Sequence, residues 1–228
     1  MLKLICVVAV VGCSVAEKRC PPKSWRAEEV SLGLYLPKID NVYEPRKEGD
    51  HSLVYYDADN KRSAIISNFT VGSKTGDNKY IFDYTAGKKY TIDLKANTCK
   101  SESFTETFKE WCITDDATFL YDAKLGYTAD GTDTVDAKVY YTENVVHSHT
   151  VGHITAITSD LNVPIQSYTF GRGGDKYLLL SLVGNVASPI PAADADVFTP
   201  PASCSSSYLP EAELDLSAGP LRRLLLGL

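Results

Sequence analysis

The feature that most restricts the fold of this chain is a series of short β-rich runs that fills residues 52–184. Turns rich in Gly, Asp, Asn or Pro separate the runs, as in hairpin-connected sheets. The helical pattern between them is weak, so about nine strands predict an all-β protein, an antiparallel sandwich or barrel. No linker or internal repeat divides the region, and we expect one domain over residues 17–204. The runs are 52–57, 62–68, 80–84, 89–94, 117–124, 135–142, 150–158, 163–170 and 176–184.

The two flanks of this body differ from it in composition. Four prolines predict that residues 20–50 are mostly extended, with little pairing to other strands. After Cys204 the chain is rich in Ser, Pro and Glu. We therefore expect residues 205–228 to form a disordered tail.

The first sixteen residues, Met1–Ala16, have the pattern of a secretory signal peptide. Lys3 is followed by the apolar run Leu4–Val11, and small residues precede Glu17. A membrane span needs about 20 apolar residues, and this run is shorter. We expect cleavage before Glu17, secretion to the extracellular space and no transmembrane segment. An uncleaved N-terminal anchor is the alternative.

Four cysteines remain when the signal peptide, with Cys6 and Cys13, is removed. An even number of cysteines in an oxidising compartment predicts two disulfides. These cysteines are spread from the start of the mature chain almost to the tail, so their bridges would tie together a whole domain. They are Cys20, Cys99, Cys112 and Cys204.

Charge and a glycosylation motif further limit the function. The chain has 23 basic and 29 acidic residues, a net charge of -6, and loss of Lys3 with the signal makes this -7. An acidic secreted protein has no electrostatic reason to bind nucleic acid or an anionic membrane. Asn68-Phe69-Thr70 is a sequon, and we expect Asn68 to carry a glycan.

Two kinds of side-chain cluster are candidates for metal binding. His147 and His149 would share a strand face and could bind zinc or copper, with His153 reached through a bend. A solvated face is the other interpretation of these histidines. Asp130, Asp133 and Asp136, and separately the turn at residues 57–60, could attract calcium. Neither cluster follows the EF-hand pattern, and turn chemistry explains both equally well.

No catalytic motif is present in the sequence. The chain contains no nucleophile elbow, zinc-protease helix, P-loop or dinucleotide fingerprint. The cysteines that remain after cleavage are expected to be bridged and are therefore poor nucleophiles. We expect a protein that is not an enzyme and that needs no cofactor, although calcium is a candidate.

Five segments, taken in order, resemble a known family. They are Cys20–Trp25, Tyr56–Arg62, Tyr90–Lys100, Ile113–Gly126 and Val197–Cys204. In this order they resemble five segments of the ependymin-related proteins. Those segments are the opening with its cysteine and prolines, the turn with tyrosine and aspartate, the central strand with its cysteine, the block that follows this strand, and the closing motif. The resemblance covers nearly all of residues 20–204.

The cysteine pattern departs from this family at one position. Family members usually have a cysteine two residues before a proline near residue 160, and here Asn162 stands two residues before Pro164. The resemblance implies the pairing Cys99–Cys204. The family's other pairing does not carry over, which leaves Cys20–Cys112 as the remaining pair. A link between two chains through one or both of these thiols is the alternative.

The resemblance implies two curved antiparallel sheets that form a sandwich or half-barrel, similar to bacterial lipoprotein carriers. An apolar pocket between the sheets would bind a lipid-like ligand, but the sequence does not identify its residues. The family is also associated with calcium, with matrix adhesion and with homodimers. We therefore expect a secreted glycoprotein that binds an apolar ligand. The alternative is a structural component of an extracellular organic matrix, including a calcified, shell-type one.

Overall fold

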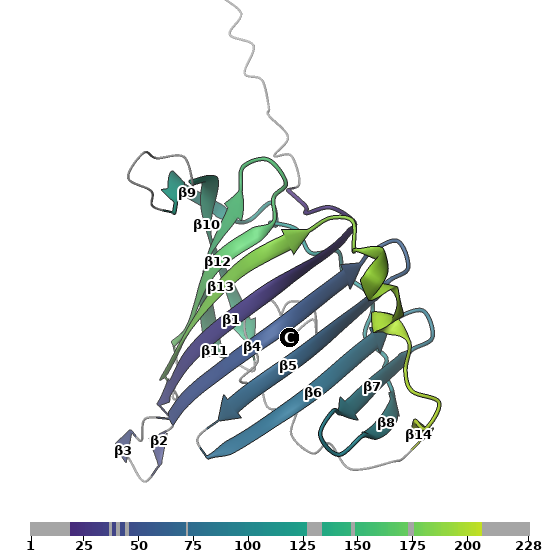
Figure 1. Cartoon of the computed structure of the whole chain (residues 1–228). Coiled ribbons are helices and arrows are strands. Elements are labelled where there is room, and N and C mark those ends of the chain that lie inside the picture. Colours follow the sequence, from purple (N-terminus) through teal and green to yellow (C-terminus); the bar gives the residue numbers. More distant parts are fainter. Residues whose placement is uncertain are drawn as a thin grey trace, which may run out of the picture.

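A computed structural model shows that the chain forms one strongly bent β-sheet (Figure 1). The model describes residues 19–36, 38–39, 42–43, 46–71, 73–126, 134–146, 149–172 and 176–206. Eleven strands pair antiparallel in the order β8-β7-β6-β5-β4-β1-β13-β12-β11-β10-β9, and β14 adds to β8 in parallel. Among the described residues, β14 and β9 are the two edges of the sheet and do not pair with each other, so the sheet does not close. This confirms the all-β prediction in its half-barrel form. The two expected layers are arms of one continuous sheet.

The strands follow the chain mainly as hairpins. β4 (Arg46–Asp57) to β8 (Thr98–Ser103) form one meander, and β9 (Thr118–Leu125) to β13 (Lys176–Ala187) form another. The remaining bounds are β1 (Ser24–Leu36), β2 (Lys38–Ile39), β3 (Val42–Tyr43), β5 (Arg62–Val71), β6 (Lys74–Asp83), β7 (Lys88–Asp93), β10 (Val135–Val146), β11 (His149–Thr158), β12 (Pro164–Arg172), η1 (Ala192–Phe198) and β14 (Ser205–Ser206).

The expectation that residues 20–50 pair little with other strands is wrong. β1 lies at the centre of the sheet and pairs with β4 on one side and β13 on the other. The prolines bracket this strand, because Pro22 precedes it and Pro37 follows it, so β1 itself contains no proline that would remove a ladder donor. β1 joins the two meanders into one sheet.

The bend gives the sheet an inner, concave face and an outer, convex face. Successive side chains of a strand point to opposite faces. On β1, Trp25, Ala27, Glu29 and Ser31 are buried on the inner face, whereas Val30, between two of them, is exposed on the outer face. The same alternation continues through the neighbouring strands, so each face can be followed from the register of the pairs.

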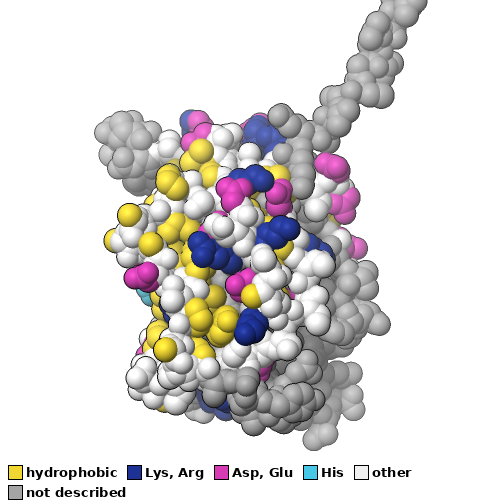
Figure 2. Space-filling model, turned by 90° about the vertical axis from the view of Figure 1, so that its right-hand side faces the viewer, with side chains coloured by type: hydrophobic (Ala, Val, Ile, Leu, Met, Phe, Trp, Pro, Cys, Tyr) yellow, Lys and Arg dark blue, Asp and Glu magenta, His cyan; other side chains and the backbone are white. Residues whose placement is uncertain are grey.

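The chain covers part of the convex face with its own C-terminal region. Val197 and Phe198 of η1 pack with Tyr55, Ala64 and Ile81 in a second core cluster outside β4–β6. The Arg62 guanidinium lies 4.2 Å from the centre of the Phe198 ring. Figure 2 views the molecule from the side of β7 and β8; hydrophobic side chains gather toward the left of this view, and charged side chains of both signs lie mainly in its middle and upper part.

The segment that we expected to be a disordered tail begins with a short strand. Ser205 and Ser206 form β14 against Lys100 and Ser101 of β8, directly after the Cys99–Cys204 disulfide. The predicted signal peptide, Met1–Ala16, and residues 207–228 lie outside the described residues. In the described part of the chain, no helix is long and apolar enough to cross a membrane.

Candidate functional site

The concave face is the candidate site because the sheet curves around it and because it changes character along its length. Across β1 and β4, Trp25 lies opposite Tyr56 and Ala27 lies opposite Val54. We call this part of the face the apolar end. Further along the same face, Glu29 lies opposite Ser52, and Ser31 lies opposite Asp50. These residues and their neighbours on the same face form the polar end.

At the apolar end, the space between the arms of the sheet is filled by the chain itself. The connection between β8 and β9 carries Trp111 and Ile113 into a core with Trp25 and Phe82, and all four are buried. Phe108, from the same connection, stacks on Tyr56 with ring centres 5.7 Å apart. Aromatic pairs of this kind add to the stabilisation that apolar burial gives. This end is a packed core.

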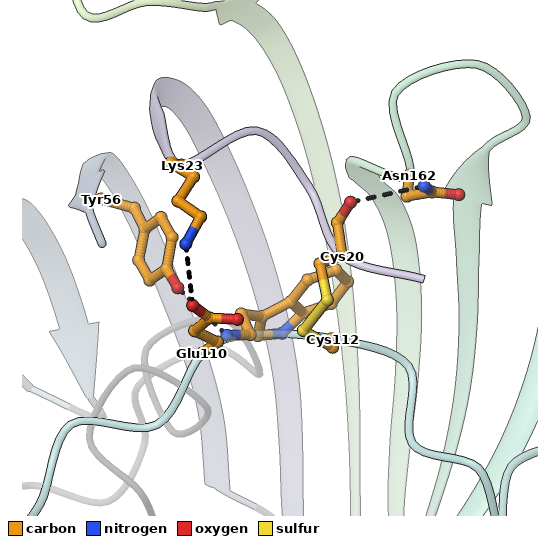
Figure 3. The surroundings of a disulfide bond; sticks show 7 residues. Cys20, Lys23, Tyr56, Glu110, Cys112 and Asn162 are labelled. Atoms are coloured by element: carbon orange, nitrogen blue, oxygen red, sulfur yellow. Dashed lines mark hydrogen bonds and ion pairs between the residues drawn. A yellow bond between two sulfur atoms is a disulfide. The ribbon is translucent and has the colours of Figure 1, made fainter. Parts of the chain in front are cut away.

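Several contacts hold the β8–β9 connection in place (Figure 3). A disulfide joins Cys112 to Cys20, and Lys23 Nζ lies 3.1 Å from Glu110 Oε1. The Trp111 backbone N–H donates to Tyr56 Oη at 3.2 Å, and Ile113 N–H donates to Arg19 O at 2.8 Å. The start of the described chain and this connection are thereby fixed to each other.

Both expected cysteine pairs, Cys20–Cys112 and Cys99–Cys204, are bonded in the structure. Asn162, which stands where the resemblance led us to expect a cysteine, lies beside the first pair. Its Nδ2 donates to Cys20 O at 3.3 Å. Position 162, where we expected a cysteine from the resemblance, therefore lies next to Cys20.

At the polar end, two buried carboxylates accept hydrogen bonds from serine hydroxyls. Asp50 accepts from Ser52 Oγ and from Ser67 Oγ, each at 2.6 Å. Glu29, which is 2% exposed, accepts from Ser181 Oγ. An ionised carboxylate can only accept hydrogen bonds, and such charge-assisted bonds compensate part of the cost of its burial.

The polar end continues onto the strands of the second meander. His153 Nδ1 lies 3.0 Å from Thr169 Oγ1, and Thr169 and Ser167 are buried. Apolar side chains of the same face, Leu179 and Val151, are buried beside them. This region thus combines hydroxyl and carboxylate groups with aliphatic surface, which suits a molecule with a polar part and an apolar part.

Burial also changes the ionisation of tyrosines near the apolar end. It raises the pKa of Tyr84 to about 12, against the opposing effect of Ser63. Burial likewise raises the pKa of Tyr56, although the Trp111 N–H favours its ionised form. Both hydroxyls are therefore neutral at physiological pH.

The structure describes only part of the histidine cluster and of the cluster formed by Asp130, Asp133 and Asp136. Asp136 is exposed, and its Oδ1 lies 2.7 Å from Lys124 Nζ, while Asp130, Asp133 and His147 lie outside the described residues. His149 belongs to β11, but its side chain lies outside the described part. Among the described residues, the one group with ligand-like spacing is Cys20, Glu110 and Cys112, and its sulfurs form a disulfide.

The acidic turn at residues 57–60 has a structural explanation. Asp57 accepts hydrogen bonds from Asn60 and lies 2.8 Å from Arg62 Nη2. Burial tends to raise the pKa of Asp57, but the hydrogen bonds from Asn60 and Arg62 outweigh it and leave this pKa below its ordinary value. The carboxylate serves to close the hairpin between β4 and β5.

Asn68, the predicted glycosylation site, is exposed on the convex face of β5. It lines a shallow hollow of about 320 Å³ together with Leu53, Ile66 and Leu94, and its Nδ2 donates to Asp77. An exposed position on a strand leaves room for a glycan.

Sequence reasoning did not identify the residues of the concave face. Ser52, Ser67 and Ser181 belong to no motif. Ser52 reaches Asp50 along β4 and Ser67 reaches it across the β4–β5 hairpin, whereas Ser181 reaches Glu29 only because β13 pairs with β1, far away in the chain. Trp111 carried no signal either. The proline-free stretch 24–36, with its alternating pattern, could have indicated the central strand.

Comparisons with known proteins agree with this architecture. The chain is 27% identical to ependymin-related protein 1 of Haliotis asinina, over 82% of this chain and 90% of that protein. It is 25% identical to ependymin-2 of Carassius auratus, over 95% of each. A structure of an uncharacterized conserved protein from Thermus thermophilus matches with a TM-score of 0.51 and 11% identity, over 81% of this chain and 90% of that one.

A LolA superfamily protein from Nitrosomonas europaea also matches, over 77% of this chain and 91% of that one, with 7% identity and a TM-score of 0.28. The family model named Ependymin matches residues 72–204, more than half of the sequence. On this evidence the chain belongs to the ependymin family.

Proposed function

We propose that the protein is a secreted, non-enzymatic binding protein that holds a lipid-like molecule on its concave face. The observation that carries this proposal is the polar end, where buried hydroxyls and carboxylates lie beside Leu179 and Val151. A sheet face that served only as a core would be lined by apolar side chains, because burying polar groups costs free energy. Groups of both kinds on one concave surface fit an amphiphile.

The physical basis of binding would be the removal of a hydrocarbon chain from water. Burial of apolar surface contributes about 25 cal/mol per Å² before the costs of association. The serine and threonine hydroxyls would fix the polar part of the ligand by hydrogen bonds. Ependymin membership supports a binding role rather than catalysis.

A titration with a fluorescent fatty acid tests this proposal. Delipidated wild-type protein should bind the probe saturably, at one probe per chain. Ser167→Phe, which puts a ring on the polar end, should weaken binding at least tenfold, whereas Leu120→Ser on β9 should leave it unchanged. Circular dichroism verifies that each variant is folded. Absence of saturable binding, or equal affinity in the Ser167→Phe variant, would contradict the proposal.

A second candidate function is that of a structural component of an extracellular, calcified organic matrix. The acidic net charge of -6 favours it, because a negatively charged surface attracts calcium. This candidate predicts that the protein is extracted from its tissue only after decalcification. Ready extraction in plain buffer would count against it.

We also propose that extracellular calcium binds and modulates the protein, either through side chains or through the glycan at Asn68. Isothermal titration of glycosylated and deglycosylated protein separates the two sources. Heat of binding that survives deglycosylation indicates side-chain ligands, and heat that disappears indicates the glycan. No heat in either sample would refute calcium binding.

A further inference from the structure

The hollow beside the sequon residue Asn68, which we call the Asn68 hollow, combines an apolar lining with a polar one. It lies on the convex face and extends from β4 to the turn after β7, across strands that run side by side (Figure 1). Three aliphatic side chains form its apolar lining, namely Leu53, Ile66 and Leu94. The other lining residues are His51, Ser67, Asn68, Asp77 and Lys95.

The register of the strands places Asn68 next to the apolar lining. Asn68 lies between His51 on β4 and Asp77 on β6. In the next row of the same face, two residues along each strand, Ile66 lies opposite Leu53. Two residues along a strand span about 7 Å. A sugar bonded directly to Asn68 Nδ2 is therefore close enough to touch both aliphatic side chains.

Asp77 holds the side-chain amide of Asn68 in one orientation. Asn68 Nδ2 donates to Asp77 Oδ1, and Asp77 Oδ2 lies 3.1 Å from Lys95 Nζ. The backbone N–H of Leu94 donates to Asp77 O at 2.9 Å, which fixes the turn that carries Leu94 and Lys95. A side-chain amide has two N–H groups. Glycosylation replaces one of them, and the other can keep the hydrogen bond to Asp77.

The hollow lies where the cover that η1 gives to the convex face ends. Leu53 and Ile66 pack against the core cluster under η1, but they remain only partly buried. Leu94, beyond them, is 46% exposed, so the described residues leave this apolar surface in contact with water. Covering such surface contributes about 25 cal/mol per Å². A group attached at Asn68 is in the right place to provide the cover.

The first sugar of an N-linked glycan is N-acetylglucosamine, and its chemistry suits this lining. Its acetamido methyl and the C–H groups of its ring are apolar, so contact with the three aliphatic side chains removes them from water. Its hydroxyl and amide groups can form hydrogen bonds with Asp77 and Lys95. The hollow holds about 320 Å³. Small-molecule sites begin at about 300 Å³, so this volume fits one sugar rather than a whole glycan.

We propose that Asn68 is glycosylated and that the first N-acetylglucosamine of its glycan packs into the Asn68 hollow. The sugar extends the cover that η1 provides, and the second sugar begins outside the hollow. The glycan is then a structural part of the convex face as well as a solubilising group. This inference concerns the convex face and does not depend on ligand binding to the concave face.

Thermal unfolding of the full chain with a single sugar tests the stabilising contact. Expression in cells that make only high-mannose glycans, followed by endoglycosidase H, leaves one N-acetylglucosamine on Asn68. This protein should unfold about 3 °C higher than Thr70→Ala, which removes the sequon and keeps Asn68. Leu94→Ser should reduce the difference to less than about 1 °C, because it removes the contact. Leu161→Ser, at a leucine that is 48% exposed outside the hollow, is the matched control and should preserve the difference.

The rate of glycan release from the native protein is a second measurement, and it does not require Thr70→Ala to fold. Peptide N-glycosidase F cuts between Asn68 and the first sugar, so it acts on the molecules whose sugar has left the hollow. Leu94→Ser should raise this population and lose its glycan about fivefold faster than the wild type. Leu161→Ser should lose it at the wild-type rate. Endoglycosidase H, which cuts after the first sugar, should act equally fast on all three proteins.

Three results would overturn the inference. The first is a peptide map of the secreted protein in which Asn68 carries no glycan. The second is an equal unfolding temperature for the single-sugar wild type and folded Thr70→Ala. The third is a native release rate that is the same in the wild type and in Leu94→Ser, or that Leu161→Ser raises as much as Leu94→Ser does.

Discussion

Asn162 donates a hydrogen bond from its side-chain Nδ2 to the backbone carbonyl of Cys20 at 3.3 Å. Asn162 has a left-handed backbone, with φ 54°, a conformation that asparagine tolerates better than most residues. Cys20 itself is bonded to Cys112, which arrives from the β8–β9 connection. One end of the sheet is thus fastened at a point where three distant segments meet.

This proximity predicts that Cys20 can form a disulfide with a cysteine at position 112 or with a cysteine at position 162. In Cys112→Ala, Cys20 becomes a free thiol. Adding Asn162→Cys to that variant should form a new disulfide to Cys20, because the side chain at 162 already lies next to it. A non-reducing peptide map and a thiol count provide the measurement. Two free thiols in the folded double variant would contradict the geometry.

Trp111 should be essential for stability, since it fills the apolar end and is 5% exposed. Trp111→Ala should lower the free energy of unfolding by about 3–5 kcal/mol, as large-to-small substitutions in cores do. Tyr121→Ala, on the exposed edge strand β9, should change it by less than about 0.5 kcal/mol. Urea unfolding of both variants makes the comparison, and equal midpoints would show that the connection does not pack as described.

The serine hydroxyls of the polar end should stabilise the fold through Asp50. Ser52→Ala and Ser67→Ala each remove a hydrogen bond to a buried carboxylate, and each should cost about 1–3 kcal/mol. Ser159→Ala, at an exposed serine after β11, serves as the control and should be nearly neutral. Urea midpoints that remain at the wild-type value in all three variants would contradict this role.

Stability should fall at high pH because of Tyr84. Its pKa is raised to about 12 by burial, so the folded form keeps the proton that the unfolded chain loses near pH 10. The contribution is fully present below about pH 10 and is lost between about pH 10 and 12, by no more than about 3 kcal/mol. Unfolding by urea at pH 8 and pH 11 measures it. Tyr84→Phe should show a smaller loss than the wild type, and an identical loss would contradict the assignment.

The sequence was informative where structure is local and less so where it depends on distant pairing. The runs at 62–68 and 176–184 correspond to β5 and β13, since strand composition and turn residues act over a few positions. β1 was missed because the prolines on both sides of it were taken as typical of the whole segment, although residues 24–36 contain no proline. β8, Thr98–Ser103, was missed as well, because its polar residues fit a strand only once β7 is beside it.

The candidate site was less accessible to sequence reasoning than the fold. Whether Glu29 faces inward is decided by its pairing with Ser52 and Val183, on the strands that flank it in the sheet. A serine in a predicted strand gives the same sequence pattern whether its side chain faces solvent or a carboxylate. The pair Cys99–Cys204 was anticipated from the family resemblance and Cys20–Cys112 as the pair that remained, but the hydrogen bond from Asn162 to Cys20 could not be anticipated.

The most direct test of lipid binding on the concave face is native mass spectrometry of the protein purified from its secreting tissue. If the concave face holds a lipid-like molecule, the spectrum should contain a species heavier than the glycosylated chain by the mass of one lipid per chain. Collisional activation should release that lipid. A spectrum with only ligand-free protein, together with failure to bind a fluorescent fatty acid, would contradict the central claim.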